Sequence, residues 1–248
     1  MLPQTVWITG GGSGIGRALA RSFAGDGHVV AISGRRGEAL AETAAATPGA
    51  IHCHPLDVTD GGAAAQVVAA IESSLGPIHI AVLNAGTYTP IWVEGFDARA
   101  FRDMIETNLI GVGNTIAPLL ESMRARGSGT IVIVASVAGF VGLPGAAAYG
   151  ASKAALINMA EALYPDARRY GIRIAVVCPG FVETPLTAQN DFAMPFLISA
   201  EEACRRIRRG LESGRFEIAF PRRFALLLKL ARLLPYRLYF RLTARIRS

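Results

Sequence analysis

Short apolar runs alternate with stretches of helical pattern along most of this chain, and this alternation constrains the fold more than any other feature. The apolar runs predict strands at residues 5–9, 28–33, 50–56, 79–83, 130–135 and 173–178. The stretches between them predict helices at residues 15–24, 38–46, 63–75, 96–123 and 148–170, with a further helix from Ser199 to Gly214. The helix at 96–123 allows a break near Gly111–Gly113. Strands 130–135 and 173–178 contain continuous apolar runs instead of alternation, as expected where helices cover both faces of a parallel sheet. These βα units predict one α/β domain, a doubly wound parallel sheet flanked by helices.

Length and cysteine content fit a single domain in a reducing compartment. A chain of 248 residues can bury one continuous core, and it contains no internal repeat or linker. Cys53, Cys178 and Cys204 match neither a zinc spacing nor a disulfide framework. The first apolar run leaves no room for a signal peptide, and no segment has the composition of a membrane span. We therefore expect a cytoplasmic protein.

The charge is divided unevenly between a near-neutral body and a basic tail. Residues 1–200 carry 12 basic and 15 acidic residues, a net charge of −3, whereas residues 201–248 carry 13 basic and 4 acidic residues, a net charge of +9. From Pro221 onward there are 8 basic residues and no acidic residue. We therefore divide the chain into a body at residues 1–220 and a basic apolar tail at residues 221–248.

The tail predicts two short amphipathic helices. The first has an apolar face made of Phe224, Leu227, Leu228, Ala231 and Leu234. After Pro235, a natural first-turn residue, a basic stripe and an apolar stripe follow, at Arg237, Arg241 and Arg245 and at Leu238, Leu242 and Ile246. Such helices can lie peripherally in a membrane interface, where apolar burial adds to attraction by anionic lipid. Their apolar faces could equally pack over the body or over a second subunit, and the sequence leaves both interpretations open.

A glycine-rich turn follows the first predicted strand and leads directly into a helix. It reads Thr9-Gly10-Gly11-Gly12-Ser13-Gly14-Ile15-Gly16, a G-x-x-x-G-x-G spacing. Glycines let the backbone turn sharply and approach a ligand, and the helix N-terminus adds free N–H groups and the positive end of a dipole. We therefore predict a dinucleotide-binding turn formed by Gly10, Ser13, Gly14, Ile15 and Gly16.

The end of the second strand favours NADP over NAD as the cofactor. An acidic residue about 20 residues after the glycines would bind the ribose 2′-hydroxyl and repel a 2′-phosphate. This place holds Ser33-Gly34-Arg35-Arg36 instead. Because a hydroxyl and one or two guanidinium groups suit a phosphate dianion, we expect Ser33, Arg35 and Arg36 to select NADP.

Three residues predict proton-transfer chemistry. Ser136 follows the fifth strand, and Tyr149 and Lys153 follow in the segment Tyr-Gly-Ala-Ser-Lys. Residues at i and i+4 share one helix face, so an ammonium group can lie beside the phenol. The pKa of a free tyrosine, about 10, is too high for an efficient base at neutral pH. The ammonium and the helix N-terminus both favour the phenolate, so we expect the pKa of Tyr149 to be lowered.

These residues resemble the short-chain dehydrogenase/reductase family, Tyr-x-x-x-Lys type, over about residues 4–200. Further motifs that carry the resemblance are Leu56-Asp57-Val58, Asn84-Ala85-Gly86, Asn108 in a helix, and Pro179-Gly180 followed by Thr184. The resemblance implies that residues 1–220 form a Rossmann dinucleotide-binding and catalytic domain. It also implies a seven-stranded sheet in the order 3-2-1-4-5-6-7, with residues 216–219 as the seventh strand.

The resemblance also implies roles for these residues. Ser136 would polarise the substrate carbonyl while Tyr149 exchanges its proton, and Lys153 would also bind the nicotinamide ribose. Asn108 would hold a water that relays protons to Lys153, and Asp57 would hydrogen-bond the adenine. The floor and the nicotinamide end of the cofactor site would come from Asn84, Ala85, Gly86, Pro179, Gly180 and Thr184.

Two positions depart from the family pattern. Ser13 lies where many NADP-using relatives have a basic residue, so the choice of cofactor rests on the residues after the second strand. Pro165 lies three turns past the catalytic pair and removes a backbone donor. We therefore expect Pro165 to kink or end that helix within a turn.

Apolar residues around the expected site predict an apolar substrate. We expect the pocket to form from Tyr88, residues 137–143 and residues 181–197, with Val137, Phe181 and Leu186 among its lining. The last segment also contains Phe192, Met194, Phe196 and Leu197. The leading interpretation is hydride transfer between NADP(H) and a secondary alcohol or its ketone, with a lipid-like or steroid-like carbonyl compound as the candidate. We expect the protein to act as a homodimer or homotetramer.

Two other classes of function fit the sequence less well. A non-catalytic NADP-sensing scaffold could bind partners or a membrane through the tail, but a sensor has no need of the catalytic residues. Nucleic-acid binding by the basic tail lacks a recognisable module, so we expect no such partner. His52 and His54 alternate on a predicted strand without a third ligand nearby, so we expect no metal site.

Overall fold

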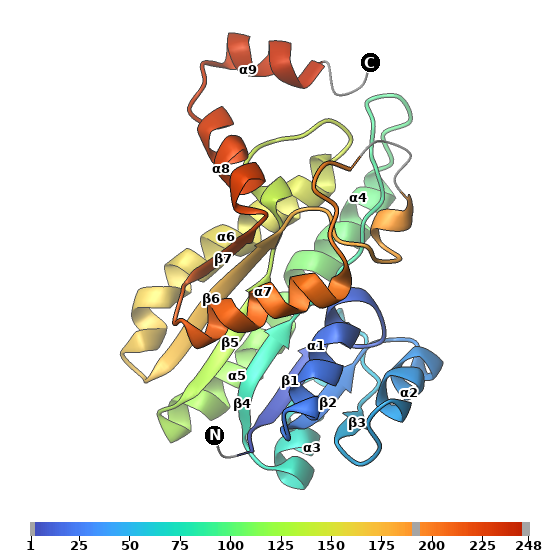
Figure 1. Ribbon diagram of the computed structural model, residues 1–248, viewed down its shortest axis with the longest axis vertical. Helices are drawn as coiled ribbons and strands as arrows, with labels where there is room; N and C mark the ends of the chain where they lie inside the picture. Colours follow the sequence, from blue (N-terminus) through green and yellow to red (C-terminus); the bar gives the residue numbers. More distant parts are fainter. Residues whose placement is uncertain (1–2, 190–193, 245–248) are drawn as a thin grey trace.

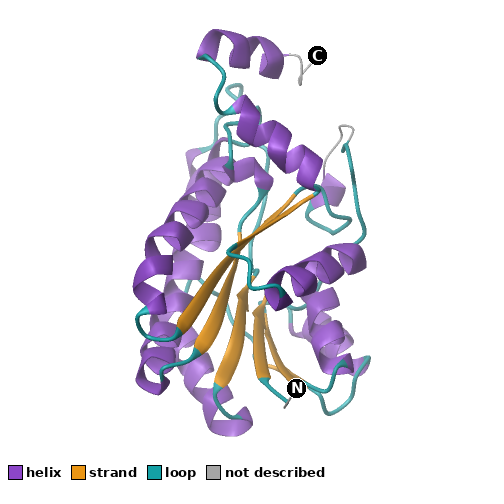
Figure 2. Ribbon diagram, turned by 60° about the vertical axis from the view of Figure 1, so that its left-hand side comes forward, coloured by secondary structure: helices purple, strands orange, loops and turns teal. Residues whose placement is uncertain are grey.

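Seven parallel strands pair into one sheet in the order β3-β2-β1-β4-β5-β6-β7. They are Thr5–Thr9 (β1), Val29–Ser33 (β2), Ile51–Cys53 (β3), Ile78–Leu83 (β4), Gly129–Val134 (β5), Ile172–Pro179 (β6) and Glu217–Phe220 (β7). The structure is a computed structural model that describes residues 3–189 and 194–244. Figure 2 shows the sheet twisting between its flanking helices. The predicted doubly wound fold and strand order are confirmed.

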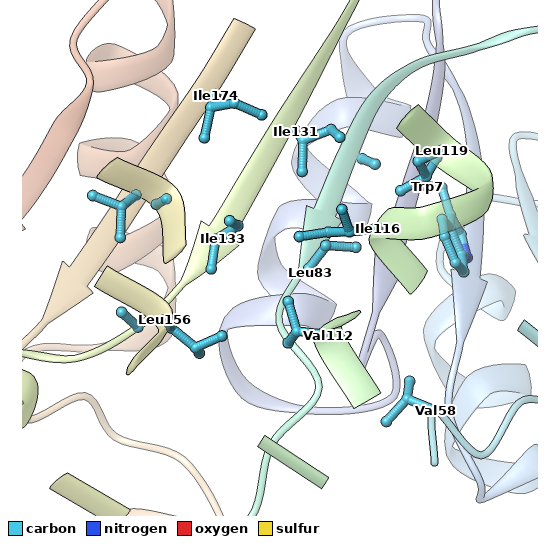
Figure 3. Close-up of a cluster of buried hydrophobic side chains, with 14 of the residues drawn as sticks. Trp7, Val58, Leu83, Val112, Ile116, Leu119, Ile131, Ile133, Leu156 and Ile174 are labelled. Carbon is cyan, nitrogen blue, oxygen red and sulfur yellow. The ribbon is translucent and has the colours of Figure 1, made fainter. Parts of the chain in front are cut away.

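Helices cover both faces of the sheet (Figures 1 and 2). One face carries α1 (Gly14–Gly25), α2 (Gly37–Ala45) and α7 (Ala200–Glu212), and the other carries α3 (Gly61–Leu75), α5 (Gly111–Arg126) and α6 (Ala147–Arg168). Alternate side chains of β1 enter the two cores: Trp7 packs on the α3–α5–α6 side, and Val6 and Ile8 pack on the other. In Figure 3, Leu83 and Ile131 of adjacent strands lie beside Ile116 of α5. The chain thus buries its strands on both faces, as their apolar runs predicted.

Two elements differ from the prediction. The third strand was expected at residues 50–56, but β3 ends at Cys53. The His54 N–H still donates to Ile32 of β2, and the Leu56 N–H donates to Gly34 just beyond that strand. Pro55 between them has no N–H, so regular pairing stops there. The helix expected at 96–123, with a break near Gly111, is instead continuous through a π-helical turn at Glu106–Ile110 that joins α4 (Ala98–Ile105) to α5.

Gly111 has a packing role instead of breaking the helix. A β-carbon placed on it would lie 2.6 Å from Cγ2 of Val58, so glycine lets α5 approach the segment after β3. At the far end of α6, the helix stops at Arg168, three residues beyond Pro165, as predicted. Ser199 caps α7 by accepting the N–H of Glu202 at 3.2 Å.

The tail forms α8 (Arg222–Ala231) and α9 (Tyr236–Thr243), and both join the core on the α6 side. Ala225, Leu228 and Tyr239 are buried there, and the Tyr239 hydroxyl donates to the carbonyl oxygen of Gly142. Leu227, expected on the packing face, is 60% exposed, because Ala225 and Leu228 form the buried face of α8. Arg245 and Ile246 lie outside the described residues. No helix within the described ranges is long and apolar enough to cross a membrane.

Candidate active site

The turn between β1 and α1 has a shape that favours glycine. Gly10 has φ of +68° and Gly14 has φ of +50°. A β-carbon on Gly16 would lie 2.2 Å from the carbonyl oxygen of Gly10, so the helix begins directly against the end of the strand. Ser13 is the N-cap of α1 and makes no side-chain capping bond. The first N–H groups of α1 therefore stay available to an anion.

A hydrogen-bonded clamp holds this turn to the neighbouring strand. Oγ1 of Thr9 accepts from the N–H groups of Asn84 and Ala85, both at 3.0 Å. Nδ2 of Asn84 donates to the carbonyl oxygens of Thr9, at 3.1 Å, and Gly10, at 3.3 Å. The sequence reasoning omitted Thr9, although its place just before the first glycine was the available signal. Asn84 thus supports the turn as well as lining the cavity beside it.

The carboxyl ends of β1, β2, β4, β5 and β6 meet at a cavity of about 380 Å³. Most of the predicted site residues line it, namely Gly10, Ser13, Gly14, Ile15, Arg35, Arg36, Asp57, Asn84, Ala85, Gly86, Ser136, Tyr149, Lys153, Pro179, Gly180, Thr184 and Leu186. Sequence reasoning missed further lining residues, including Thr107 in the π-helical turn and Gln189 in a short 3-10 turn. This edge is where ligands bind in open α/β sheets.

Ser33 is a predicted cofactor residue that does not line this cavity. Its side chain is fully buried, and its Oγ accepts a hydrogen bond of 2.9 Å from the indole nitrogen of Trp7. The prediction that this hydroxyl contacts a phosphate is therefore wrong, because the hydroxyl is engaged inside the core. Arg35 and Arg36 therefore supply the positive charge at this end of the cavity.

Arg35 and Arg36 present guanidinium groups beyond the end of β2. Both are exposed, and neither is in an ion pair within the described residues. Asp57 lines the same side of the cavity and accepts the Thr59 N–H at 3.0 Å and its hydroxyl at 2.9 Å. The Thr59 N–H is the main cause of the lowered pKa of Asp57, and Arg35 contributes through its charge. This side therefore offers two free cations and one carboxylate already engaged by its own turn.

Tyr149 lies on the first turn of α6, between Ser136 and Tyr88. The Ser136 hydroxyl lies close enough to the phenol to favour its ionised form and donates to the carbonyl oxygen of Pro179 at 3.4 Å. The Tyr88 ring meets the Tyr149 ring edge-on, with 5.1 Å between centroids. The Tyr149 side chain is half-buried, and protein atoms surround its phenol on most sides. This burial raises the pKa of the phenol to about 12. The predicted lowering of this pKa is wrong, because burial penalises the phenolate more than the nearby Ser136 hydroxyl favours it.

Lys153 is buried one helical turn after Tyr149. Its Nζ donates to the carbonyl oxygen of Val134 at 2.9 Å and lies 5.6 Å from the centre of the Tyr149 ring. Burial lowers the pKa of Lys153 to about 8. The ammonium is thus held by the end of β5, beside the phenol ring.

Asn108 occupies the π-helical turn and lies behind the cavity. It is fully buried, its Oδ1 accepts the Thr87 N–H at 2.7 Å, and its Nδ2 donates to the Thr87 carbonyl oxygen at 2.9 Å. A β-carbon on Gly86 would lie 3.2 Å from Oδ1 of Asn108 and 3.6 Å from Nζ of Lys153. The three residues therefore meet at one point, and the water relay that the family resemblance implies stays a prediction.

The residues expected to line the substrate pocket do not all lie at the cavity. Leu186 lines the cavity, and Tyr88 lies against Tyr149. Val137 is 4% exposed within the core and does not line the cavity, because it follows Ser136 with its side chain turned inward. Phe192 falls outside the described residues.

An aromatic group joins the substrate side to the tail. Phe224 of α8 lies between Phe181, at 6.0 Å between ring centroids, and Phe196, at 6.1 Å. Phe181 therefore packs against the tail and is absent from the lining of the 380 Å³ cavity. Sequence reasoning placed Phe224 only on the packing face of the tail, since no local pattern links it to residues some 30 to 40 positions earlier.

The residues present fit a nicotinamide dinucleotide. Thr184 covers the glycine turn so closely that a β-carbon on Gly14 would lie 2.7 Å from its Cγ2. The cavity extends from the guanidinium groups, past the N-terminus of α1, to Tyr149 and Lys153. The positive helix end and the guanidinium groups suit phosphates.

The family model described as short chain dehydrogenase matches residues 4–193. The chain is 36% identical over 247 residues to an uncharacterized oxidoreductase of Myxococcus xanthus, covering 98% of both chains. It is 31% identical over 188 residues to the 3-oxoacyl-(acyl-carrier-protein) reductase MabA of Mycobacterium bovis, covering 76% of this chain and 73% of that protein. The chain belongs to the short-chain dehydrogenase family and is an NAD(P)-dependent oxidoreductase.

Solved structures share this fold. A short-chain dehydrogenase from Streptomyces avermitilis matches with a TM-score of 0.83 and 27% identity, covering 99% of this chain and 98% of that chain. A short-chain dehydrogenase/reductase from Burkholderia phymatum, solved in complex with NAD, matches with a TM-score of 0.85 over 92% of each chain. Its identity is 23%, so this second likeness concerns the fold.

Replacing Ser33 by alanine should lower stability and leave cofactor affinity unchanged. The substitution leaves the buried Trp7 N–H without its acceptor, which costs about 1–3 kcal/mol. Urea unfolding measures the first effect, and titration of NADPH fluorescence measures the second. If NADPH binding weakened while the free energy of unfolding stayed unchanged, Ser33 would be a cofactor-binding residue and the correction above would be wrong.

Proposed function

We propose that this protein transfers a hydride between NADP(H) and a secondary alcohol or its ketone, with an apolar carbonyl compound as the substrate. The observation that carries the proposal is the meeting of Ser136, Tyr149 and Lys153 in a cavity that starts at a glycine turn. Membership of an oxidoreductase family supports the reaction class. A non-catalytic sensing scaffold is not favoured, because it has no use for an enclosed phenol beside a serine hydroxyl and a buried lysine.

The protein's own residues would manage the proton at the carbonyl oxygen. A bound nicotinamide would supply or accept the hydride. With a pKa of about 12, Tyr149 is protonated at neutral pH and can donate its proton to the oxygen of a ketone. The Ser136 hydroxyl can hydrogen-bond the same oxygen, and the nearby Lys153 ammonium stabilises the phenolate left by proton transfer. Oxidation of an alcohol reverses these steps.

Two observations support NADP as the preferred cofactor. Arg35 and Arg36 lie beyond the end of β2 without ion-pair partners among the described residues. The carboxylate of Asp57 in the same region is held by Thr59. Guanidinium groups in this arrangement suit a 2′-phosphate.

The aromatic and aliphatic residues beside Tyr149 support an apolar substrate. Leu186 lines the cavity, and Phe181, Phe196 and Phe224 form an apolar group on the adjoining loops and α8. We also propose a homodimer or homotetramer, because β3 is an edge strand of the sheet and pairs with β2 alone in the described structure. An open edge of this kind suits a symmetric partner.

Replacing Tyr149 by phenylalanine should abolish turnover while NADPH binding persists. The ring and its packing remain, but the transferable proton is gone, so kcat should fall at least about 100-fold. Ketone-dependent oxidation of NADPH and NADPH fluorescence titration separate the two effects. Tyr164→Phe on the same helix is the matched control and should keep wild-type activity. Near wild-type turnover in the Tyr149 variant would contradict the proposed role.

Ketone reduction should slow as the pH rises through about 8. Lys153 is cationic below its pKa of about 8 and neutral above it, whereas Tyr149, with a pKa of about 12, keeps its proton throughout. kcat/KM should therefore be flat in the neutral range and decline by up to about tenfold per pH unit above pH 8. Lys153→Arg keeps its charge and should lack this decline. A wild-type profile that stays flat to about pH 10 would refute the assignment.

Replacing Arg35 by aspartate should shift the preference from NADP toward NAD. The new carboxylate repels a 2′-phosphate and can accept a hydrogen bond from a 2′-hydroxyl. The ratio of kcat/KM for NADPH over that for NADH should fall at least about tenfold, as expected for a lost charged hydrogen bond. Arg124→Asp, at an exposed position on α5, is the control for the change in charge. An unchanged ratio would show that Arg35 does not discriminate.

A further inference from the structure

The tail helices expose an apolar surface that their packing on the body does not use. Eight of the fourteen large apolar side chains exposed in residues 3–189 and 194–244 lie between positions 226 and 242. This apolar strip consists of Leu226, Leu227, Leu230, Leu233, Tyr236, Leu238, Phe240 and Leu242. Figures 1 and 2 both show α9 beyond the end of the sheet opposite the N-terminus. Concentrated exposure of this kind marks an interaction surface.

A basic recess of about 600 Å³ opens beside α8, between that helix, β7 and the second half of α7. Its charged lining residues are Arg206, Arg209, Arg215, Glu217, Arg222 and Lys229. Glu217, the one carboxylate among them, pairs with Lys229 at 2.5 Å. Arg209, Arg215 and Arg222 are exposed and form no ion pair in the part of the chain that the structure describes. The recess therefore holds positive charge that the chain itself does not neutralise.

The basic recess and the apolar strip form one continuous surface. Leu226 lines the recess and is 58% exposed. Leu230 follows it at i+4, on the same side of α8, and Leu233 lies in the turn just after the helix. Cationic groups thus adjoin a row of leucines, which matches the division of a phospholipid into an anionic headgroup and apolar chains.

We propose that this surface docks the protein peripherally on an anionic lipid bilayer. Headgroup phosphates would enter the basic recess, and the apolar strip would insert at the boundary between headgroups and acyl chains. Charge complementarity selects this occupant, since residues 222–244 contain six basic residues and no acidic residue. The helices are short, so their attachment is interfacial.

A second copy of this chain fits the same surface less well. In a twofold interface the same patch meets itself, so the net positive charge of one copy would oppose that of the other. Like charges placed opposite each other weaken such a contact. An anionic bilayer instead offers a phosphate to each cation.

Vesicle co-sedimentation of the full chain tests the proposal. We expect at least about tenfold tighter binding to phosphatidylcholine vesicles containing about 30 mol% phosphatidylglycerol than to phosphatidylcholine alone. Sodium chloride at about 0.5 M should weaken the difference by screening the recess. Absence of binding to either vesicle, or equal binding to both, would overturn the proposal.

Paired substitutions locate the binding surface. Leu227→Ser with Leu230→Ser removes apolar area, and Arg209→Gln with Arg222→Gln removes charge; each pair should lower vesicle binding at least about fivefold. Val93→Ser and Arg124→Gln are the matched controls at exposed positions on the body. Ketone reduction without vesicles should be unchanged in both pairs. Wild-type binding by both pairs would place the contact elsewhere and refute the proposal.

Sedimentation velocity separates the lipid from a second copy. If the wild type does not bind vesicles and sediments as a dimer, whereas the variant with Leu227→Ser and Leu230→Ser sediments as a monomer, the surface is a contact between copies. The proposal then fails. All four positions are exposed, so unfolding temperatures should match the wild type. If the leucine pair unfolds, Leu233→Ser replaces it, because that side chain is 78% exposed.

Discussion

The cavity depends on the contact between Gly16 and the carbonyl oxygen of Gly10. With 2.2 Å between that oxygen and a β-carbon at position 16, any larger residue would push α1 away from β1. The helix N-terminus would then leave the edge of the sheet where the strands end. The Thr9–Asn84 clamp fixes the same turn from β4. A binding site for phosphate thus follows from one close approach of backbone to backbone.

Burial, more than pairwise charge, sets the chemistry of the site. It raises the pKa of Tyr149 to about 12 and lowers that of Lys153 to about 8, so each group is driven toward its neutral form. At neutral pH Tyr149 holds a proton and Lys153 is still cationic. The arrangement therefore favours proton donation to a carbonyl oxygen, with an ammonium ready to offset the negative charge that proton transfer leaves behind.

The tail connects the substrate side of the cavity to the proposed lipid surface. Phe224 packs between Phe181 and Phe196, and Nζ of Lys229 lies 4.9 Å from the centre of the Phe140 ring. The same helix exposes its leucines on the other side. A protein docked through these leucines would hold the proposed substrate side of its cavity near the bilayer, where apolar carbonyl compounds concentrate.

The sequence by itself determined the alternation of strands and helices, the glycine turn and the i, i+4 pairing of Tyr149 with Lys153, because these depend on neighbours within a few residues. Its family motifs also predicted the strand order, now observed. Tertiary structure decided that Ser33 bonds to Trp7, 26 residues away, and that Asn108 lies in a π-helical turn against Gly86. It also decided the pKa values, because burial is the sum of contacts from distant segments, which no local pattern contains.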